Sequence, residues 1–357
     1  MKILITGICG FVGNAIAHAL KERHSNLEIF GIDNFIRPGS GSNRQKLKKL
    51  GAKIFHGDLR NVSDLEQMPK ADVVIDAAAN PSVLAGVDGK MSSRQLVEHN
   101  LYGTINLLEY CKQHQAQLIL LSTSRVYSIA PLVELPVEID SKAFRLAQGA
   151  SLPTGVSAHG IDELFSTEPP ISLYGSTKKS SELLALEYGE VFDFPVLINR
   201  CGVLAGAGQF GRSEQGIFSY WINSYLRKQP LKYIGFNGSG YQVRDCLHPH
   251  DLAVLISLQL HRKYPSISDR VVNCSGGIES AYSLQQLSDW CATRFGYHDI
   301  ASSNEKRFFD IPWMVLDSRK AEQLWKWKPT HSTEETLEEI AQHAEAHPEW
   351  LQLSAPF

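Results

Sequence analysis

The stretch KILITGICGFVG, at residues 2–13, decides the fold of this chain. Its apolar run predicts a buried strand at Lys2–Thr6, and helical spacing over Phe11–Arg23 follows the glycine-rich turn. Such a turn lets the backbone approach a diphosphate closely, and the helix N-terminus offers unpaired N–H groups to its charge. We therefore expect the pyrophosphate of a dinucleotide at Gly7, Gly10, Phe11, Val12 and Gly13.

A carboxylate at the end of the next strand indicates which dinucleotide is bound. Asp33 ends the expected strand Leu27–Asp33 and stands 20 positions after Gly13 (33 − 13). A carboxylate at this position accepts hydrogen bonds from the adenosine ribose hydroxyls and repels a 2′-phosphate. Arg37 lies nearby and argues the other way, but the acid at the strand end dominates. The expected cofactor is NAD rather than NADP.

Two later stretches complete the expected cofactor site. Asp58 follows a third strand at Ala52–Phe55 and is placed to hold the adenine edge, with Leu59 packing beside it. A carboxylate that caps a helix before Arg60 is an equally supported interpretation of Asp58. After the strand Val73–Asp76, three small residues let the backbone pass close to the cofactor, namely Ala77, Ala78 and Ala79.

Apolar runs and helical patterns alternate through the first half of the chain. Further strands are expected at Leu118–Ser122 and Val196–Asn199, and further helices at Leu96–Lys112 and Tyr174–Val191. Wholly apolar strands that alternate with helices are typical of a parallel sheet covered on both faces. The expected fold class is therefore α/β, with a doubly wound parallel Rossmann sheet.

The second half is less regular and predicts a smaller C-terminal α/β lobe for the substrate. We expect an NAD-binding Rossmann domain at residues 1–200 and a mainly substrate-binding lobe at 201–357, from which the chain returns to the Rossmann domain. A strand is expected at Val271–Cys274. Helices are expected at Glu214–Leu226, Asp251–His261, Ser283 to Phe295, Arg319–Trp325 and Glu334–Ala346.

Residues 128–170 form an insertion in the Rossmann domain that shows no clean periodicity and is rich in Pro, Gly and Ser. A loop of this length within a compact domain is usually functional or mobile. We expect a lid over the substrate, with a tolerated surface insertion as the alternative.

The composition narrows the class of protein. The chain has 357 residues and a formal net charge of −3, without a recurring basic helix face, which argues against a nucleic-acid partner. Six cysteines are scattered without a Cys-x-x-Cys pair, so we expect reduced thiols, Cys201 among them as a small buried residue, and a cytoplasmic location. No apolar run reaches the ~20 residues that span a bilayer, so no membrane partner is expected. His248 and His250 have no evident third ligand, so no metal is expected.

A tyrosine and a lysine carry the expected chemistry. Tyr174 and Lys178 stand four positions apart in an expected helix and therefore on one face of it. A phenol with a pKa near ~10 is a poor base at neutral pH, and a neighbouring ammonium lowers that pKa by stabilising the phenolate. Beside a dinucleotide, this pair indicates hydride transfer at a carbinol carbon.

Together these motifs resemble the extended short-chain dehydrogenase/reductase family, and within it the NAD-dependent nucleotide-sugar epimerases and dehydratases. The resemblance spans nearly the whole chain. It rests on Gly7, Gly10 and Gly13, Asp33-Asn34, Gly57-Asp58-Leu59-Arg60, Asn100 with the stretch 103–109, Ser122-Thr123 before Val126-Tyr127, Tyr174 with Lys178, the stretch 242–245, Asn273 before Gly276-Gly277, and Trp327-Lys328-Pro329.

The resemblance implies roles for single residues. Tyr174 would be the acid/base, Lys178 would bind the nicotinamide ribose and tune Tyr174, and Thr123 would hydrogen-bond the reacting hydroxyl. Arg244 would grip the diphosphate of a nucleotide-sugar with its guanidinium fork, or else pair with Asp245. The resemblance also assigns Asn34, Arg37 and Asn100 to the cofactor site and Ser124, Asn199 and Gln215 to the substrate.

The chain departs from the family pattern at two residues and in the interval from Thr123 to Tyr174, which at 51 residues (174 − 123) is longer than in most 4-epimerases. Asp76 stands where many relatives have a histidine, and Ser128 rather than Gly follows Tyr127. The helices Leu96–Lys112 and Tyr174–Val191 pair across a two-fold axis in many relatives, which implies a homodimer.

The two residues directly after Thr123 indicate the reaction. Dehydratases of the family carry Asp-Glu there, whereas this chain has Ser124-Arg125, so epimerisation through a transient keto-sugar is expected. Residues 128–170, 209–216 and 238–248 are most similar to the CDP-tyvelose (CDP-paratose) 2-epimerases, which implies 2-epimerisation of a CDP-linked deoxyhexose. The alternatives are a UDP-hexose or UDP-uronate 4-epimerase, a simple reductase that consumes NADPH, and an NAD-binding regulatory protein without turnover.

Overall fold

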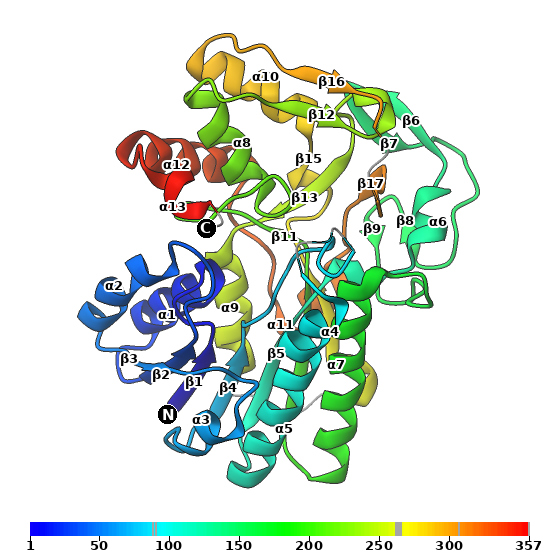
Figure 1. Cartoon of the computed structure of the whole chain (residues 1–357). Helices are drawn as coiled ribbons and strands as arrows, with labels where there is room; N and C mark the ends of the chain where they lie inside the picture. Colours follow the sequence, from blue (N-terminus) through cyan, green and yellow to red (C-terminus); the bar gives the residue numbers. More distant parts are fainter. Residues whose placement is uncertain (88, 90, 261–265, 306–307, 356–357) are drawn as a thin grey trace.

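Seven parallel strands form the central sheet of the computed structural model, which describes residues 1–87, 89, 91–260, 266–305 and 308–355 (Figure 1). Their spatial order is β14-β10-β5-β4-β1-β2-β3. The order reverses beside β1, and ligands of such sheets bind outside the carboxyl ends of the strands at that point. The predicted doubly wound fold is confirmed. The strands are β1 Lys2–Thr6, β2 Glu28–Asp33, β3 Lys53–His56, β4 Val73–Asp76, β5 Gln117–Thr123, β10 Val196–Cys201 and β14 Val271–Cys274.

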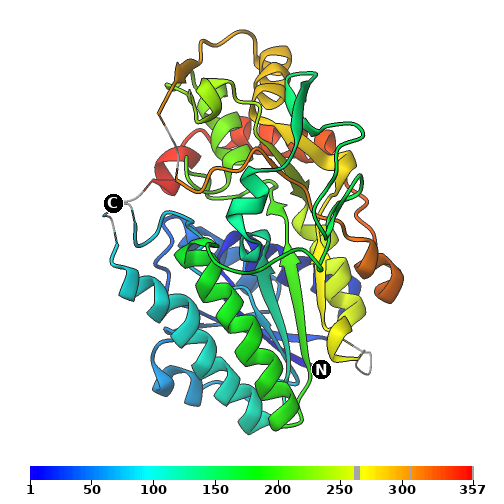
Figure 2. The same ribbon diagram turned by 90° about the vertical axis from the view of Figure 1, so that its right-hand side faces the viewer.

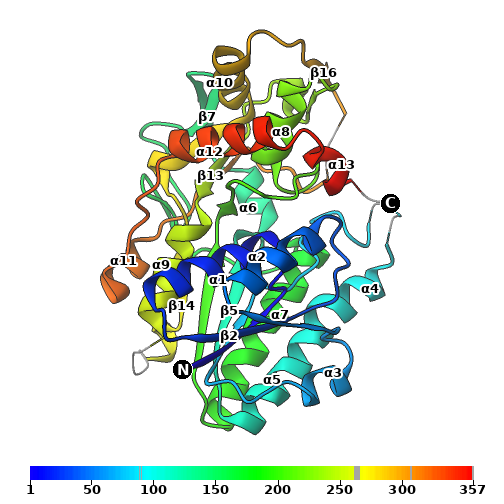
Figure 3. The ribbon, with the colours of Figure 1, turned by 90° about the vertical axis from the view of Figure 1, so that its left-hand side faces the viewer.

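Helices cover both faces of the sheet, which explains why its strands are apolar throughout. Figure 3 shows α1, α2 and α9 on one face, and the cyan and green helices in the foreground of Figure 2 are α5 and α7 on the other. Ile16 of α1 and Ile256 of α9 share one apolar core, and Leu108 of α5 and Ala185 of α7 share the second. The helices are α1 Phe11–Arg23, α2 Asn43–Lys49, α3 Val62–Glu66, α5 Gly103–His114, α7 Ser172–Val191, α9 Pro249–Gln259 and α11 Arg319–Trp325.

The smaller lobe lies above the sheet in Figure 1 and is built from short strands and four helices. The chain leaves it to form α9 and β14 in the Rossmann layer, then returns. Its strands are β11 Val203–Leu204, β13 Val243–Leu247, β15 Ala281–Ser283 and β17 Trp313–Met314, with a separate pair β12 Lys232–Ile234 and β16 Ala301–Ser303. Its helices are α8 Ile217–Leu226, α10 Leu284–Phe295, α12 Thr333–Ala346 and α13 Trp350–Ser354. The division at 1–200 and 201–357 stays a prediction.

Several expected helices have different bounds, and three of them show why. The helix predicted at Leu96–Lys112 is α4 Ser93–Val97 and α5, joined by a π-helical turn at Glu98–Tyr102. The helix predicted from Glu214 begins only at Ile217, because Gly216 before it has a left-handed φ of 72°. The helix predicted to reach His261 ends at Gln259, and His261 lies outside the described residues.

The insertion at residues 128–170 is folded and packs against the smaller lobe. It contains α6 Ile129–Val133, a hairpin of β6 Val137–Asp140 with β7 Ala143–Leu146, and a second pair of β8 Val156–Ser157 with β9 Gly160–Ile161. Leu132 and Phe165 share an apolar core with Val243 and Trp313 of that lobe. Every residue of the insertion is described, and none lines the large cavity. The expected lid is therefore not observed, and strands of two to four residues are too short to give a periodic signal.

In the part of the chain that the structure describes, no helix is both long enough and apolar enough to traverse a bilayer.

Candidate active site

A cavity of about 1070 Å³ lies at the carboxyl ends of the sheet strands and is lined from both lobes. The volume exceeds the about 300–1,000 Å³ of a typical small-molecule site, so a cofactor and a second ligand can share it. The sheet contributes Gly7, Asp33 and Thr123, and the smaller lobe contributes Arg244.

The cofactor end of the cavity is built from backbone and small residues. Gly7 has a φ of 61°, and a Cβ added to it would lie 3.1 Å from the Cα of Ala78. A Cβ on Gly13 would lie only 2.4 Å from the carbonyl oxygen of Gly7. The first turn therefore accepts no side chain at these positions, which fits the approach of a diphosphate to bare backbone. The expected residues Gly7, Gly10, Phe11, Val12 and Gly13 all line the cavity.

Asp33 fixes the same turn while it borders the cavity. Its Oδ2 accepts a hydrogen bond from the Cys9 amide at 2.9 Å, and its Oδ1 accepts one from the Phe35 amide at 2.8 Å. Burial raises the pKa of this carboxyl, although the two amide hydrogen bonds act against the shift. The carboxylate oxygens keep lone pairs for further donors, as recognition of a ribose requires.

Asp58 and Asn34 form one hydrogen-bonded group at the adenosine end of the cavity. The Asn34 amide donates to Asp58 Oδ2 at 3.0 Å, and Arg60 binds the same carboxylate at 2.7 Å. The hydrogen bond from Arg60 holds the pKa of Asp58 far below its usual range. Asp58, Asn34 and Leu59 line the cavity. The alternative in which Asp58 caps a helix does not fit α3, because the N-cap residue of that helix is Asn61.

The small residues after β4 are held in place by the first strand. The Thr6 hydroxyl accepts hydrogen bonds from the amides of Ala77 and Ala78, each at 3.0 Å, and donates to Asp76 at 2.6 Å. Ala77, Ala78 and Ala79 line the cavity as expected. Asp76, the departure from the family pattern, is buried, and burial raises the pKa of its carboxyl.

Asn100 and Asn199, two of the expected ligand-binding residues, do not line the cavity. Asn100 accepts from the Asn80 amide at 2.8 Å and donates to Thr177 at 3.2 Å, so it ties the loop after β4 to α7 and does not line the cavity. Asn199 is fully buried in β10, where its side-chain amide exchanges two hydrogen bonds of 2.8 Å with Gln259 of α9. Asn199 does not line the cavity, because the strand expected to end there runs on to Cys201 and Asn199 lies within it, beneath the helix layer.

Tyr174 lies in the first turn of α7 and lines the cavity with Thr123. Its side chain is only 6% exposed. Burial raises the pKa of Tyr174 to about 12, while the Thr123 hydroxyl and the Arg125 charge act in the opposite direction. Arg125 is thus a cation that acts on this pKa, and the expected effect of Lys178 on it stays a prediction.

Lys178 is 2% exposed, and its positive charge lowers the pKa of Asp76 at the end of β4 against the effect of burial. Within the described residues its ammonium has no hydrogen-bond or ion-pair partner, although an ammonium offers three donors. Lys178 is not among the residues that line the cavity, so its contact with the nicotinamide ribose stays a prediction.

The loop after β5 places Ser124 and Arg125 at the cavity, and only Ser124 was predicted to be a site residue. Thr123 begins a 3-10 turn at Ser124–Val126, and its hydroxyl accepts a hydrogen bond from the Arg125 amide at 3.2 Å. Ser124 lines the cavity as expected, and Arg125 does so as well, with a hydrogen bond of 3.3 Å to the Phe309 carbonyl. Arg125 was used only to argue against dehydration. Its position next to Thr123 was the available signal for a cavity residue.

The smaller lobe brings several cations to the cavity. Arg244 donates to the carbonyls of Val243 and Ile311 at 2.7 and 2.9 Å, and no ion pair joins it to Asp245 within the described residues. Arg37 binds Gln215 at 2.6 Å, so this expected cofactor residue connects the two lobes. Sequence reasoning missed two lining cations, Arg212 in a loop and Lys232 at the start of β12.

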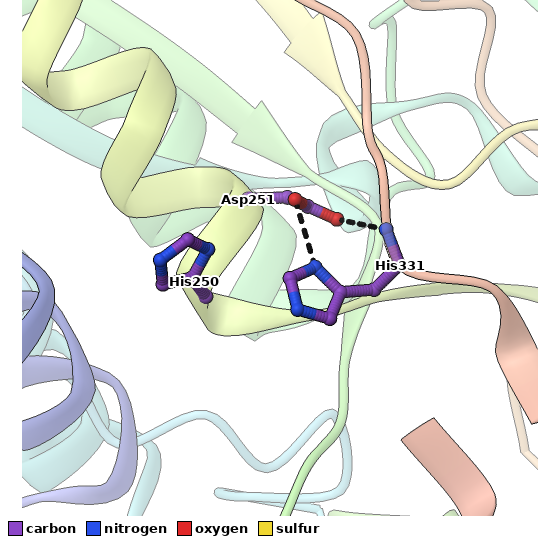
Figure 4. A group of neighbouring side chains, drawn as sticks. All are labelled: His250, Asp251 and His331. Carbon is purple, nitrogen blue, oxygen red and sulfur yellow. Dashed lines mark hydrogen bonds and ion pairs between the residues drawn. The ribbon is translucent and has the colours of Figure 1, made fainter. Parts of the chain in front are cut away.

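A histidine cluster lies at the start of α9 (Figure 4). The expectation that His250 has no third ligand nearby is corrected, because ligand atoms of His250, Asp251 and His331 lie within 4.8 Å of one another. Asp251 already accepts four hydrogen bonds, two from Thr330 and two from His331, at 2.7 to 3.1 Å. These bonds tie the loop before α12 to α9, which accounts for the cluster as a structural contact.

The fold and the Tyr–Lys helix at this cavity define a dinucleotide-dependent enzyme of the short-chain dehydrogenase/reductase type. Residues 3–275 match the NAD dependent epimerase/dehydratase family. The chain therefore belongs to that family, and its cofactor is NAD.

Relatives and solved structures agree with this assignment over nearly the full length. The CDP-paratose 2-epimerase of Salmonella typhi is 28% identical over 362 residues, which cover 95% of this chain and 98% of the relative. The UDP-glucuronic acid 4-epimerase of Bacillus cereus, solved with UDP-glucuronic acid and NAD, is 27% identical with a TM-score of 0.74 and covers 97% of this chain and 99% of its own. The UDP-glucose 4-epimerase of Thermotoga maritima has a TM-score of 0.79 at 21% identity, with 98% and 100% covered.

Proposed function

We propose that the protein is an NAD-dependent nucleotide-sugar epimerase that inverts C2 of a CDP-linked deoxyhexose. The observation that carries the proposal is the cavity end at Tyr174, where Thr123, Ser124 and Arg125 lie together. The turn at Gly7, Gly10 and Gly13, together with Asp33, would hold NAD, which would supply the hydride acceptor and donor for the carbinol carbon. The similarity to the CDP-paratose 2-epimerase supports C2 and the CDP group.

In this proposal each residue at the reacting carbon handles a proton or a hydrogen bond. Tyr174 takes the proton of the sugar hydroxyl when the hydroxyl is oxidised and gives it back when the keto group is reduced. Thr123 donates to or accepts from the same oxygen. Lys178 binds the nicotinamide ribose. Arg125 adds a positive charge that favours the phenolate of Tyr174.

The chain lacks the side chains for removal of water after Thr123. Elimination needs an acid and a base beside the sugar ring, and Ser124 and Arg125 supply neither at neutral pH because the guanidinium stays protonated. Inversion needs one acid/base group, a hydride acceptor and room for the keto-sugar to turn. The cavity volume of about 1070 Å³ supports that requirement.

A UDP-hexose or UDP-uronate 4-epimerase is the second candidate. It is favoured by the 27% identity with the Bacillus cereus enzyme and by the lining cations Arg212, Lys232 and Arg244, which suit a substrate with an added carboxylate. An NAD-binding regulatory protein without turnover is the alternative of another class.

Incubation of the purified protein with CDP-paratose, UDP-glucose and UDP-glucuronic acid in deuterated water, followed by NMR, tests the proposal. Inversion at C2 of the CDP-sugar without deuterium at that carbon is expected, because the hydride returns from the cofactor. Inversion only at C4 of a UDP-sugar rejects the first choice in favour of the second. No inversion of any of the three sugars, with NAD bound, favours the regulatory alternative.

We also propose a homodimer formed through α7 and the helical segment that runs from α4 through the π-helical turn Glu98–Tyr102 to α5, and a cytoplasmic location. Exposed apolar residues on these elements, Val97, Tyr102 and Leu183, support the interface, since each is at least 40% exposed. The free thiols of all six cysteines support a reducing compartment. Light scattering of the wild type and of Leu183→Glu tests the interface, with a monomeric variant as the expected result and an unchanged mass as the contrary one.

A further inference from the structure

Two cysteines meet on the floor of the cavity beside the catalytic side chains. The sulfurs of Cys201 and Cys274 are 3.5 Å apart, which is van der Waals contact between two thiols. Both residues are free cysteines, and Cys201 lines the cavity whereas Cys274 is fully buried. No step of the proposed reaction uses them.

The sheet register explains why the two thiols meet. Cys201 ends β10 and is the direct partner of Cys274 on β14 and of Thr123 on β5. Residues in register on neighbouring parallel strands point to the same face, so the row Thr123, Cys201, Cys274 crosses the sheet at its carboxyl edge. Strands lie about 4.8 Å apart, and disulfides join Cα atoms about 4.4–6.8 Å apart, so a bond between the two sulfurs needs only small side-chain rotations.

We propose that Cys201 and Cys274 form a redox-sensitive dithiol that a peroxide entering the cavity converts into a disulfide. Cys201 reacts first, because it alone of the pair borders the cavity. Its sulfur attacks one peroxide oxygen, the O–O bond breaks, and Cys201 becomes a sulfenic acid as one water leaves. The Cys274 sulfur then attacks the Cys201 sulfur, the S–O bond breaks, and the second water carries away the Cys274 proton. Two thiols are oxidised and one hydrogen peroxide is reduced to two waters.

Burial of the Cys274 thiol affects how readily it attacks the sulfenic acid on Cys201. Burial and the neighbouring Cys201 raise the pKa of the Cys274 thiol well above its ordinary value. A buried thiol is a slow nucleophile in general, but contact with the sulfenic sulfur makes the second attack intramolecular. The pair therefore behaves as an attacking thiol with its own resolving thiol, the arrangement that stops oxidation at a reversible stage.

The disulfide would affect turnover by changing the packing in the row Thr123, Cys201, Cys274. Cys201 lines the cavity together with Tyr174 and is the register partner of Thr123. Drawing the Cys201 sulfur toward Cys274 moves it away from Thr123 and changes the packing under the reacting groups. This effect on turnover rests on the proposed epimerase function, whereas formation of the disulfide does not.

Peptide mapping of the whole protein after hydrogen peroxide treatment tests the proposal. The expected product is a cross-linked pair of peptides that contain Cys201 and Cys274, lighter by two hydrogen atoms and separated again by dithiothreitol. In Cys274→Ala the cross-link is lost and Cys201 is oxidised further to sulfinic acid. The matched control Cys291→Ala, a buried cysteine of α10, forms the cross-link at the wild-type rate. Cross-links elsewhere, or a wild-type Cys201 that is converted to sulfinic acid without a cross-link, overturn the proposal.

Protection by ligands tests the route through the cavity. NAD⁺ together with CDP, each at about 100 times its dissociation constant, leaves about 2% of cavities without one of the two ligands and should slow cross-linking about 50-fold. An unchanged rate, with binding verified by calorimetry, overturns access through the cavity. Since the mapping needs no turnover, an inactive protein that still forms the cross-link contradicts the proposed function and not the dithiol.

Discussion

The two ends of the cavity are built from different parts of the polypeptide. At the first turn, Gly7, Gly13 and Ala78 leave backbone alone to face the cofactor. Under the smaller lobe, long side chains reach the cavity from separate segments, such as Arg212 from a loop and Arg244 from β13. The cofactor end is therefore defined within a short piece of sequence, while the substrate end is assembled only by folding. Binding of NAD should depend on backbone geometry, and substrate choice should depend on individual side chains.

Tyr174 stands where the two ends meet, and its removal should have the largest effect. Tyr174→Phe should lower kcat by about 10²–10⁴-fold, because the phenol oxygen is the proton carrier. Bound NAD and the melting temperature should stay at wild-type values, since only a hydroxyl is lost. The matched control is Tyr188→Phe in the same helix, whose hydroxyl binds Glu109 at 2.9 Å and does not line the cavity. Unchanged turnover in Tyr174→Phe would contradict the assigned role.

Arg244 tests the substrate end. A hydrogen bond from a charged group contributes about 1.5–3 kcal/mol, so Arg244→Gln should weaken nucleotide-sugar binding by about 10–150-fold. Arg244→Lys should recover part of this loss, because it keeps the charge without the bidentate fork. Calorimetry with UDP-glucose and the CDP-sugar measures the effect, and NAD content should not change. Arg145→Gln in β7, outside the cavity, serves as the control. If Arg244→Gln lost bound NAD but still bound the nucleotide-sugar, Arg244 would belong to the cofactor end and not to the substrate end.

Gly13 tests the cofactor end. The methyl group of Gly13→Ala would lie 2.4 Å from the Gly7 carbonyl oxygen, and such overpacking costs about 1–3 kcal/mol of unfolding free energy. Denaturant unfolding and the NAD content of the purified protein measure the two expected losses. Gly41→Ala is the control, because nothing lies within 4 Å of a Cβ at that position. If Gly13→Ala and Gly41→Ala had the same stability and the same NAD content, close backbone contact at Gly13 would not explain cofactor binding.

The pH dependence of turnover should reveal the charge around Tyr174. Burial raises the pKa of Tyr174 to about 12, so the phenolate fraction at neutral pH is small and grows about tenfold per pH unit. Turnover should therefore rise with pH, with an apparent pKa below 12 in the enzyme that holds oxidised NAD, because the nicotinamide carries a positive charge.

Arg125→Gln provides the comparison for the pH profile. The substitution removes a charge that opposes the burial effect, so the rising limb should move to higher pH. Arg145→Gln should leave the profile where it is. A pH-independent rate, or a limb that moves to lower pH in Arg125→Gln, would exclude this account of the base.

Local spacing was enough to predict the Rossmann half of the fold. The strand Lys2–Thr6, the helix Phe11–Arg23 and Asp33 at the end of β2 all follow from periodicity and one glycine-rich turn. The insertion at 128–170 could not be predicted in this way. Its short strands are stabilised by contacts with Val243 and Trp313, which lie far away in sequence.

Local sequence patterns likewise predicted some residues of the candidate site and missed others. Tyr174 could be named because Lys178 follows it at helical spacing, and Thr123 because it ends an apolar strand. Asn199 was misplaced because the strand expected to end there runs on to Cys201, so Asn199 lies within β10 and binds Gln259 on α9. Arg212 in a loop and Lys232 in the three-residue strand β12 were missed because neither segment has a period that indicates which residues meet a cavity.

The edge strand β14 has a consequence for biosynthesis. It supplies residues 271–274 to a sheet whose other six strands are complete by residue 201, so those six strands wait for about seventy more residues (271 − 201 = 70). During translation β10 would present an unpaired parallel edge, the kind of surface that invites association with other chains. A fragment that stops at residue 200 should therefore aggregate rather than behave as a transplantable nucleotide-binding module.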